Sequence, residues 1–158
     1  NSTDEMILFY KELIKKFPII SIEDGLAEDD WSGWKLLTKE MGNAIHLIGD
    51  DLFVTNIKRI QKGIEEKSAN GVLIKLNQIG SVSETIKAIA LARSNTYVVA
   101  ISHRSGETAD DFIADLSVAC GADFLKAGSM SRGERIAKYN RLTEIESELT
   151  IKYDKKYK

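Results

Sequence analysis

The stretch VVAISHRSGETADDF, residues Val98–Phe112, is typical of a buried strand that runs directly into a helix. The apolar run at its start predicts a strand that is covered on both faces. Thr108 and Asp111 predict the start of the helix, because a hydroxyl and an acidic residue at this spacing satisfy the first helical N–H groups. A histidine, an arginine, a serine and a glycine lie between the two elements, so the strand ends in polar residues.

The same alternation of strand and helix occurs along the whole chain. Strands are expected at residues 18–22, 45–49, 71–75, 97–102 and 122–127. Helices are expected at residues 2–16, 30–41 and 55–67, from Ser81, from Thr108, and at residues 132–149. Apolar strands that alternate with helices indicate a parallel sheet covered by helices.

The helical spacing of apolar residues predicts which side chains face the core. These are Ile57, Ile60, Ile64, Ile86, Ile89, Phe112, Ile113, Leu116, Ile136, Tyr139, Leu142, Ile145 and Leu149. The lysine-rich end of the chain, residues 150–158, is expected to be a frayed tail.

Two architectures fit this pattern: a doubly wound open sheet, or part of a (β/α)₈ barrel. A full barrel typically needs about 250 residues. The 158 residues hold roughly five of the eight units, so a barrel requires further strands before residue 1. No Gly/Ser-rich linker marks an internal domain boundary.

Composition excludes several classes of protein. A net charge of −2 argues against a general nucleic-acid or anionic-membrane binder. The lone Cys120 excludes an internal disulfide and fits a reducing compartment. It is expected to be a small apolar residue of a helix that packs in the protein core, rather than a nucleophile. No apolar run is long enough to span a bilayer.

Every expected strand ends in a charged or titratable residue. In chain order these residues are Glu23, Asp50, Lys75, the run His103, Arg104 and Ser105, and Lys126. The carboxyl ends of parallel strands lie on one rim, where the sites of both architectures are found. We therefore expect these side chains to lie together.

The residue types indicate metal-assisted chemistry on an anionic substrate. The carboxylates Glu23 and Asp50 suit Mg²⁺, which prefers oxygen ligands. A lysine close to a dication and to other cations has a lowered pKa and can act as a base. Arg104 and Ser105, at the start of the following segment, suit an oxyanion or a phosphate. The set fits removal of a proton next to a carboxylate.

Each of these residues also has a structural interpretation when it is taken alone. Glu23 and Asp24 can cap the segment that follows them. Lys75 can extend from an edge strand into solvent, and an isolated histidine such as His103 is more often structural than catalytic. The coincidence of all five strand ends favours a site.

Five ordered motifs resemble the enolase family, the phosphopyruvate hydratases of glycolysis, in its bacterial form. They are SIEDGLAEDDW (residues 21–31), LIGDDLFVTN (47–56), LIKLNQIGSVSETI (73–86), SHRSGET (102–108) and SMSRGERIAKYNRL (129–142). The resemblance covers about residues 2–149 and implies the C-terminal part of a TIM-like (β/α)₈ barrel. About five βα units, preceded by one helix, are then expected within residues 1–158.

The resemblance implies a lyase that reversibly dehydrates 2-phosphoglycerate to phosphoenolpyruvate with Mg²⁺ as cofactor. Glu23 and Asp50 resemble two of the three carboxylates that hold the metal, and Asp51 resembles a neighbour without that role. Lys75 resembles the base that removes the C2 proton. Lys126 resembles a second lysine, which contacts the substrate carboxylate.

The remaining strand-end residues resemble the substrate-binding part of the family's site. Arg104 and Ser105 resemble the phosphate-binding pair, and Ser105 is expected near a second metal ion. His103 is expected to line the same pocket.

The sequence also departs from the family pattern. Ala127 stands where the family has threonine, which we expect to loosen the loop after Lys126. The family's N-terminal domain, its first barrel strands, its third metal carboxylate and its general-acid glutamate have no counterpart in this chain. We therefore expect the isolated chain to have little or no hydratase activity.

The resemblance carries further expectations about partners and location. It implies a cytoplasmic protein, a homodimer or a larger oligomer at full length, and no direct nucleic-acid partner. An alternative is plasminogen binding by a secreted or cell-surface form through the C-terminal Lys158. A third possibility, a phosphate-binding doubly wound module unrelated to enolase, requires a strand order that does not follow the sequence.

Overall fold

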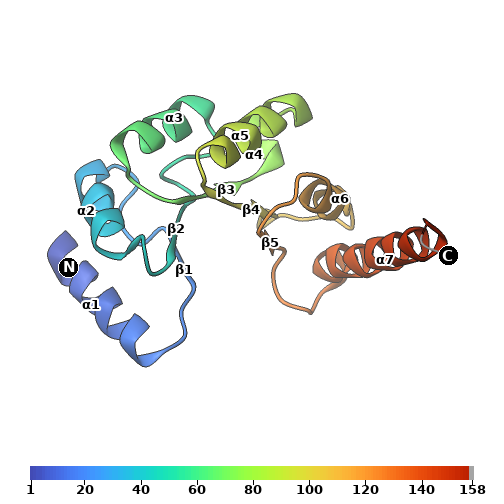
Figure 1. The fold of residues 1–158 in the computed structure, drawn as a ribbon, viewed down its shortest axis with the longest axis horizontal. Helices are drawn as coiled ribbons and strands as arrows, with labels where there is room; N and C mark the ends of the chain where they lie inside the picture. Colours follow the sequence, from blue (N-terminus) through green and yellow to red (C-terminus); the bar gives the residue numbers. More distant parts are fainter. Residues whose placement is uncertain (157–158) are drawn as a thin grey trace. The chain divides into compact units, whose positions relative to one another are not determined.

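The computed structural model describes the backbone of residues 1–156 and the side chains of residues 1–150. Its strands are β1 (Ser21–Glu23), β2 (His46–Gly49), β3 (Gly71–Ile74), β4 (Val98–Ser102) and β5 (Phe124–Lys126). Its helices are α1 (Thr3–Lys16), α2 (Trp31–Met41), α3 (Ile57–Glu66), α4 (Leu76–Ile79), α5 (Val82–Ser94), α6 (Phe112–Ala119) and α7 (Gly133–Lys156). Figure 1 shows the strand–helix alternation.

The five strands form one parallel sheet in the order β1-β2-β3-β4-β5. In the register of β1 with β2, Ile22 lies opposite Leu47, and in that of β2 with β3, Ile48 lies opposite Gly71. A doubly wound sheet reverses its strand order at a switch point, whereas here each strand pairs with the next along the chain. The barrel-type prediction is confirmed, and the doubly wound alternatives are wrong.

The chain divides into two compact units, residues 1–100 and residues 101–158. The division falls inside β4, where no change in composition marks it. In the first unit, helices α2, α3 and α5 lie along one side of the strands (Figure 1). Every residue of β3 is buried, as its continuous apolar run predicts.

Phe53 is central to the core of the first unit. It is fully buried and lies against Gly49 at the end of β2 and Gly63 in α3. A Cβ atom at either glycine would overlap the ring of Phe53. Close packing of the loop after β2 against α3 therefore requires glycine at both positions.

The second unit is built on the packing of α6 against α7 and against β5. Leu116 in α6 and Ile145 in α7 are buried. Arg141 of α7 makes a bidentate ion pair with Asp115 of α6, with nitrogen–oxygen distances of 2.8 and 2.9 Å. The planar guanidinium matches the two carboxylate oxygens and fixes how these helices lie against each other.

Two predicted helix starts are confirmed and one is wrong. Ser2 forms a capping box with Glu5, and the Ser81 side chain accepts the backbone N–H of Glu84. Thr108 does not begin the next helix, because its hydroxyl accepts the N–H of Asp110 in a local turn. Helix α6 therefore begins at Phe112. The first strand is also shorter than predicted, since residues 18–20 lie outside the sheet.

Several predicted core positions are exposed. Ile86 is 47% exposed, because α5 uses the small residues Ala88 and Ala92 beside Ile89 to approach β3 and α3 closely. Phe112, the first residue of α6, and Leu149 of α7 are also exposed. Helical spacing identifies a candidate face, but the contact of two helices covers only part of it.

Other expectations fail at helix ends. Cys120 is the C-terminal cap of α6 and is only half-buried, so it is not a fully buried core residue as the sequence predicts. Helix α7 continues to Lys156, because no glycine or proline interrupts it after Gly133. Lys158, on which the plasminogen alternative depends, lies outside the described residues. None of the described helices has the length and apolar character needed to cross a bilayer.

Candidate functional site

All of the predicted site residues lie at or directly after the carboxyl end of a strand. Those of the first unit are Glu23, Asp50 and Lys75, at the ends of β1, β2 and β3. Those of the second unit are His103, Arg104 and Ser105 after β4, and Lys126 at the end of β5. The strand-end positions are therefore as the sequence predicts.

Asp50 and Lys75 form a close ion pair across the neighbouring strands β2 and β3. The distance between Lys75 Nζ and Asp50 Oδ2 is 2.6 Å, and the two side chains are only 15% and 9% exposed. Lys75 therefore does not extend into solvent, and its structural alternative is wrong. The second oxygen of Asp50, Oδ1, is buried and has no hydrogen-bond partner.

An unpartnered buried carboxylate oxygen is costly unless a cation or a donor reaches it. Asp50 Oδ1 is such an oxygen, and it belongs to a residue that the sequence predicts to be a metal ligand. Hard divalent cations such as Mg²⁺ bind oxygen ligands of this kind. The donor set at the end of β2 therefore fits a magnesium ion.

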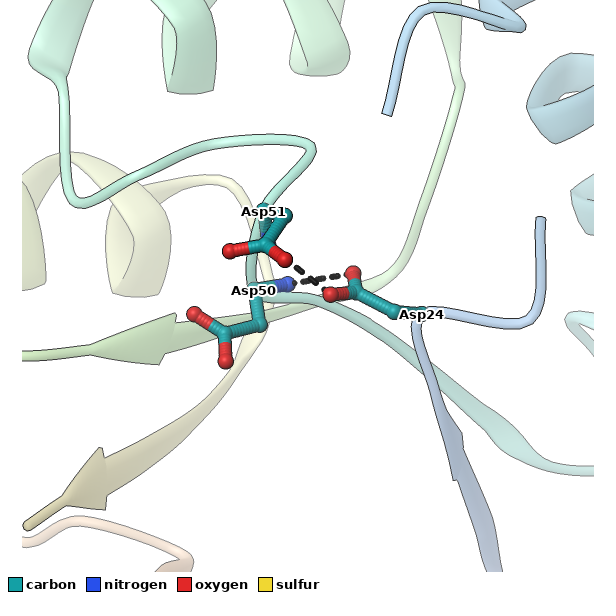
Figure 2. A group of neighbouring side chains, drawn as sticks. All are labelled: Asp24, Asp50 and Asp51. Carbon is teal, nitrogen blue, oxygen red and sulfur yellow. Dashed lines mark hydrogen bonds between the residues drawn. The ribbon is translucent and has the colours of Figure 1, made fainter. Parts of the chain in front are cut away.

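Asp24 holds the loop that carries Asp50. Its carboxylate accepts the backbone N–H of Asp50 at 2.8 Å and that of Asp51 at 2.9 Å. Figure 2 shows the Asp24 carboxylate directed at this backbone, while the carboxylate of Asp50 points away from it. The sequence suggests that Asp24 caps the segment directly after it. The N–H groups that Asp24 accepts belong instead to the loop after the next strand, β2.

One oxygen atom from each of Asp24, Asp50 and Asp51 lies within 4.8 Å of the others. Burial raises the pKa of the Asp24 carboxyl, and so do the nearby charges of Asp50 and Asp51, although the two N–H donors act in the opposite direction. Both Asp24 oxygens already accept N–H groups. Asp50 is therefore the better metal ligand, and Asp24 acts as its support.

Glu23, the other predicted metal ligand, is exposed at the end of β1. It is paired in register with Ile48, two residues before Asp50. The structure therefore places Glu23 and Asp50 at the ends of adjacent parallel strands.

Thr55 supports Lys75 and was not identified from the sequence. Its hydroxyl accepts the backbone N–H of Lys75 at 2.9 Å and donates to Gln78 Oε1 at 3.1 Å. Thr55 is fully buried and has a φ of +55°, an unusual value for a β-branched residue. Such backbone strain is typical of functional sites, but only a structure reveals it.

In the second unit, His103 is held by strand β5. Its backbone N–H and its ring Nδ1 both reach the carbonyl oxygen of Lys126, at 2.9 and 2.8 Å. A carbonyl oxygen only accepts hydrogen bonds, so Nδ1 carries the proton. In the neutral ring, Nε2 is then the acceptor.

The segment after β4, residues 103–108 (below, the β4 loop), is held by α7. Arg135 donates hydrogen bonds to the carbonyl oxygens of Arg104 and Ser105, at 2.9 and 2.8 Å. Glu107 accepts the backbone N–H of Arg104 at 2.7 Å and forms a 2.7 Å ion pair with Lys138. The Lys138 side chain is 1% exposed.

Burial acts to raise the pKa of the Glu107 carboxyl, but the hydrogen bonds from Lys138 and Arg104 and the positive charge of Lys138 outweigh it. The pKa of Glu107 is therefore lowered. Arg135 and Lys138 could not be identified from the sequence, because apolar residues alone predict the inward face of α7. Their spacing of three residues was the only signal, and surface charges show the same spacing.

The loop after β5 is also held by α7. Ala127 is buried, and Gly128 adopts a φ of +84°, which favours glycine. A Cβ atom on Gly128 would lie 3.0 Å from Cδ of Arg135. The hydroxyl of Tyr139 donates to the carbonyl of Gly128.

Known proteins match this chain over almost its whole length. A family model described as the enolase C-terminal TIM barrel domain matches residues 1–157. Over 145 residues, the chain is 61% identical to an enolase of Helicobacter hepaticus (strain ATCC 51449 / 3B1) and 60% identical to one of Helicobacter pylori (strain HPAG1). Each match covers 92% of the chain but 34% of the relative. The chain thus spans about a third of the length of these curated relatives and corresponds to their C-terminal part.

Proposed function

Because the chain belongs to the enolase family, as the C-terminal part of its TIM-barrel domain, we propose that it supplies the catalytic base and substrate-binding residues of a phosphopyruvate hydratase. The substrate is 2-phosphoglycerate and the product is phosphoenolpyruvate. The ion pair of Lys75 with Asp50 carries this proposal, because it joins the expected base to the expected metal ligand at 2.6 Å.

Lys75 removes the C2 proton of the substrate. For this step the amine must be neutral, so that its nitrogen can accept the proton. The supporting hydrogen bond from the Lys75 backbone to Thr55 fixes where the side chain begins. The expected gain from a positioned base of this kind is about 10²–10⁴-fold in rate.

Asp50 and Glu23 are the residues of this chain that would hold Mg²⁺. When bound, the ion supplies positive charge that stabilises the substrate carboxylate as the C2 proton leaves. Asp50 offers the buried oxygen Oδ1, and Asp24 keeps the Asp50 backbone in place. A carboxylate that is already oriented loses little conformational freedom when the ion binds.

The second unit binds the charged groups of the substrate. Arg104 and Ser105 take the phosphate, Lys126 takes the carboxylate, and His103 lines the pocket with its ring fixed by the Lys126 carbonyl. Arginine suits phosphate because its planar guanidinium donates two parallel hydrogen bonds. A cytoplasmic location follows from this glycolytic role.

A chimeric enzyme tests the proposal. The chain replaces the C-terminal third of the Helicobacter hepaticus enolase, and formation of phosphoenolpyruvate is followed by ultraviolet absorbance. We expect an active chimera, and a loss of about 10²–10⁴-fold in kcat for Lys75→Met. The matched control is Lys58→Met, at an exposed position of α3. A Lys75→Met chimera as active as the control would contradict the proposal.

The isolated chain is proposed to have little or no hydratase activity. The family's third metal carboxylate and its general-acid glutamate correspond to no residue of this chain. Dehydration of 2-phosphoglycerate by the chain alone, at a rate close to that of the chimera, would overturn this part of the proposal.

A further inference from the structure

The β4 loop is held from one side by side chains of α7. Arg135 is buried and donates to two consecutive carbonyl oxygens, those of Arg104 and Ser105. Its aliphatic stem passes over Gly128, where any side chain would crowd it. The Arg135 side chain is thus held both along its aliphatic stem and at its guanidinium group.

This contact sets the direction of the backbone N–H groups in the loop. In a trans peptide unit the C=O and the N–H of the next residue point in opposite directions. Because the carbonyls of Arg104 and Ser105 point to Arg135, the N–H groups of Ser105 and Gly106 point away from it. Ser105 and Gly106 are exposed, and the position of a Cβ on Gly106 is open space. Successive N–H groups that point to one side form an anion-binding nest.

The buried pair of Glu107 and Lys138 holds the loop on both sides of this nest. Glu107 accepts the N–H of Arg104, so the peptide before the nest is fixed. Lys138 donates to the carbonyl of Thr108 at 2.7 Å and also to that of Glu134 at 2.8 Å. A fully buried ammonium group with these partners resists displacement, because moving it would leave a charge unpaired.

We propose that Arg135 is a positioning residue for anion binding, which directs the N–H groups of Ser105 and Gly106 at the phosphate group of the ligand. The Glu107–Lys138 pair fixes the rest of the loop in the same conformation. This inference rests on the proposed function, in which the β4 loop takes the substrate phosphate. The affinity for phosphate then also depends on Arg135, which donates hydrogen bonds to the side of the loop opposite the phosphate.

A purely structural role for Arg135 predicts a different result. If the residue only stabilised α7, its replacement would lower stability and leave the affinity of the folded protein for phosphate unchanged. The double contact with two carbonyls also distinguishes arginine from lysine, whose single ammonium group cannot reproduce the planar fork. Arg135→Lys keeps the charge and loses this geometry.

The test uses the ¹⁵N-labelled 158-residue chain and inorganic phosphate as the probe. Nuclear magnetic resonance measures the amide shifts of Ser105 and Gly106 during a phosphate titration of the wild type, Arg135→Gln and Arg135→Lys. Arg132→Gln is the matched control, because Arg132 lies just before the same helix and its side chain is 74% exposed. Thermal unfolding of each variant shows the folded fraction.

We expect saturable shifts of both amides in the wild type and a phosphate Kd raised at least tenfold in Arg135→Gln. The phosphate Kd of Arg135→Lys should lie between those of the wild type and Arg135→Gln. The Kd of Arg132→Gln should stay within twofold of the wild-type value. An Arg135→Gln protein that is folded and binds phosphate within twofold of the wild type overturns the inference. If Arg135→Gln does not fold, a wild-type Kd in Arg135→Lys overturns it instead.

The failure of the proposed function gives a different pattern. A wild type without saturable shifts at Ser105 and Gly106 shows that the β4 loop does not bind phosphate, and both proposals then fail together. Binding by the wild type with no effect of the Arg135 variants leaves the proposed function intact and removes only the positioning role.

Discussion

The loop after β2 and the β4 loop are held by side chains of opposite charge. Asp24 accepts backbone N–H groups from the loop after β2, whereas Arg135 donates to backbone carbonyls of the β4 loop. An anionic support turns N–H groups toward itself, and a cationic support turns carbonyls toward itself. The side of the loop opposite Arg135 therefore presents N–H groups, which suit an anion, while the loop held by Asp24 presents the Asp50 carboxylate, which suits a cation.

The side chains that support the two loops also differ in burial. Asp24 is half-buried on a neighbouring strand end, whereas Arg135 and Lys138, which support the β4 loop from α7, are buried. A buried charge that loses its partner is more costly than a partly exposed one. We therefore expect the stability of the β4 loop to be more sensitive to substitution of its supporting side chains than that of the loop after β2.

The largest expected effect is that of Glu107→Gln. The change leaves the Lys138 ammonium without its charged partner, and breaking such a buried pair typically costs about 3 kcal/mol of the free energy of unfolding. Urea denaturation measures this quantity, with Glu146→Gln on the exposed face of α7 as the control. The double variant Glu107→Gln/Lys138→Met should recover part of the loss. A loss no larger than that of the control would contradict the account.

A smaller effect is expected from Asp24→Asn. The amide offers one acceptor oxygen where the carboxylate offers two, so one N–H of Asp50 or Asp51 loses its partner. We expect a net loss of about 1 kcal/mol in the free energy of unfolding, because an unmade hydrogen bond of a partly buried group costs about 1–2 kcal/mol and removal of the half-buried charge offsets part of this cost. Asp29→Asn, at an exposed position, is the control. Equal urea midpoints for the two variants would show that Asp24 does not support the loop.

The smallest expected effect is on the pH dependence of the free energy of unfolding. Glu107 of the β4 loop and Asp24, which supports the loop after β2, contribute to this dependence with opposite signs. The pKa of Glu107 is lowered in the folded state, so its contribution is present above the unfolded value of about 4.5 and is lost as the pH falls through the folded pKa. The pKa of Asp24 is raised, so its carboxylate opposes folding increasingly as the pH rises through the unfolded value of about 3.8.

Urea denaturation between pH 6 and pH 3 measures this dependence. The stability difference between the wild type and Glu107→Gln should shrink as the pH falls, since a protonated Glu107 also leaves Lys138 without a charged partner. A difference that is constant across this range would show that Glu107 is not ionised in its pair with Lys138.

The strand ends of the fold could be predicted from the sequence. The apolar runs before Asp50 and Lys75 are short and end at a charge, so the positions of both residues follow from the pattern alone. A parallel sheet then brings neighbouring strand ends together. The prediction succeeded because it needed only local sequence and one general rule of topology.

The supports of the site could not be predicted in the same way. Asp24 reaches N–H groups 26 and 27 residues away, and Arg135 reaches carbonyls 31 and 30 residues away. Such contacts depend on the packing of whole elements, which sequence periodicity does not encode. Buried charges such as Lys138 also contradict the apolar pattern from which an inward face is assigned.

The difference between the two loops is tested most directly by titrating the labelled 158-residue chain first with Mg²⁺ and then with inorganic phosphate. We expect Mg²⁺, added in the absence of phosphate, to shift the carboxyl ¹³C signal of Asp50 more strongly than the amides of Ser105 and Gly106. We expect inorganic phosphate to shift the amides of Ser105 and Gly106 more strongly than the carboxyl ¹³C signal of Asp50. Phosphate-induced shifts centred on Asp50, or Mg²⁺-induced shifts centred on Ser105 and Gly106, would contradict this difference between the two loops.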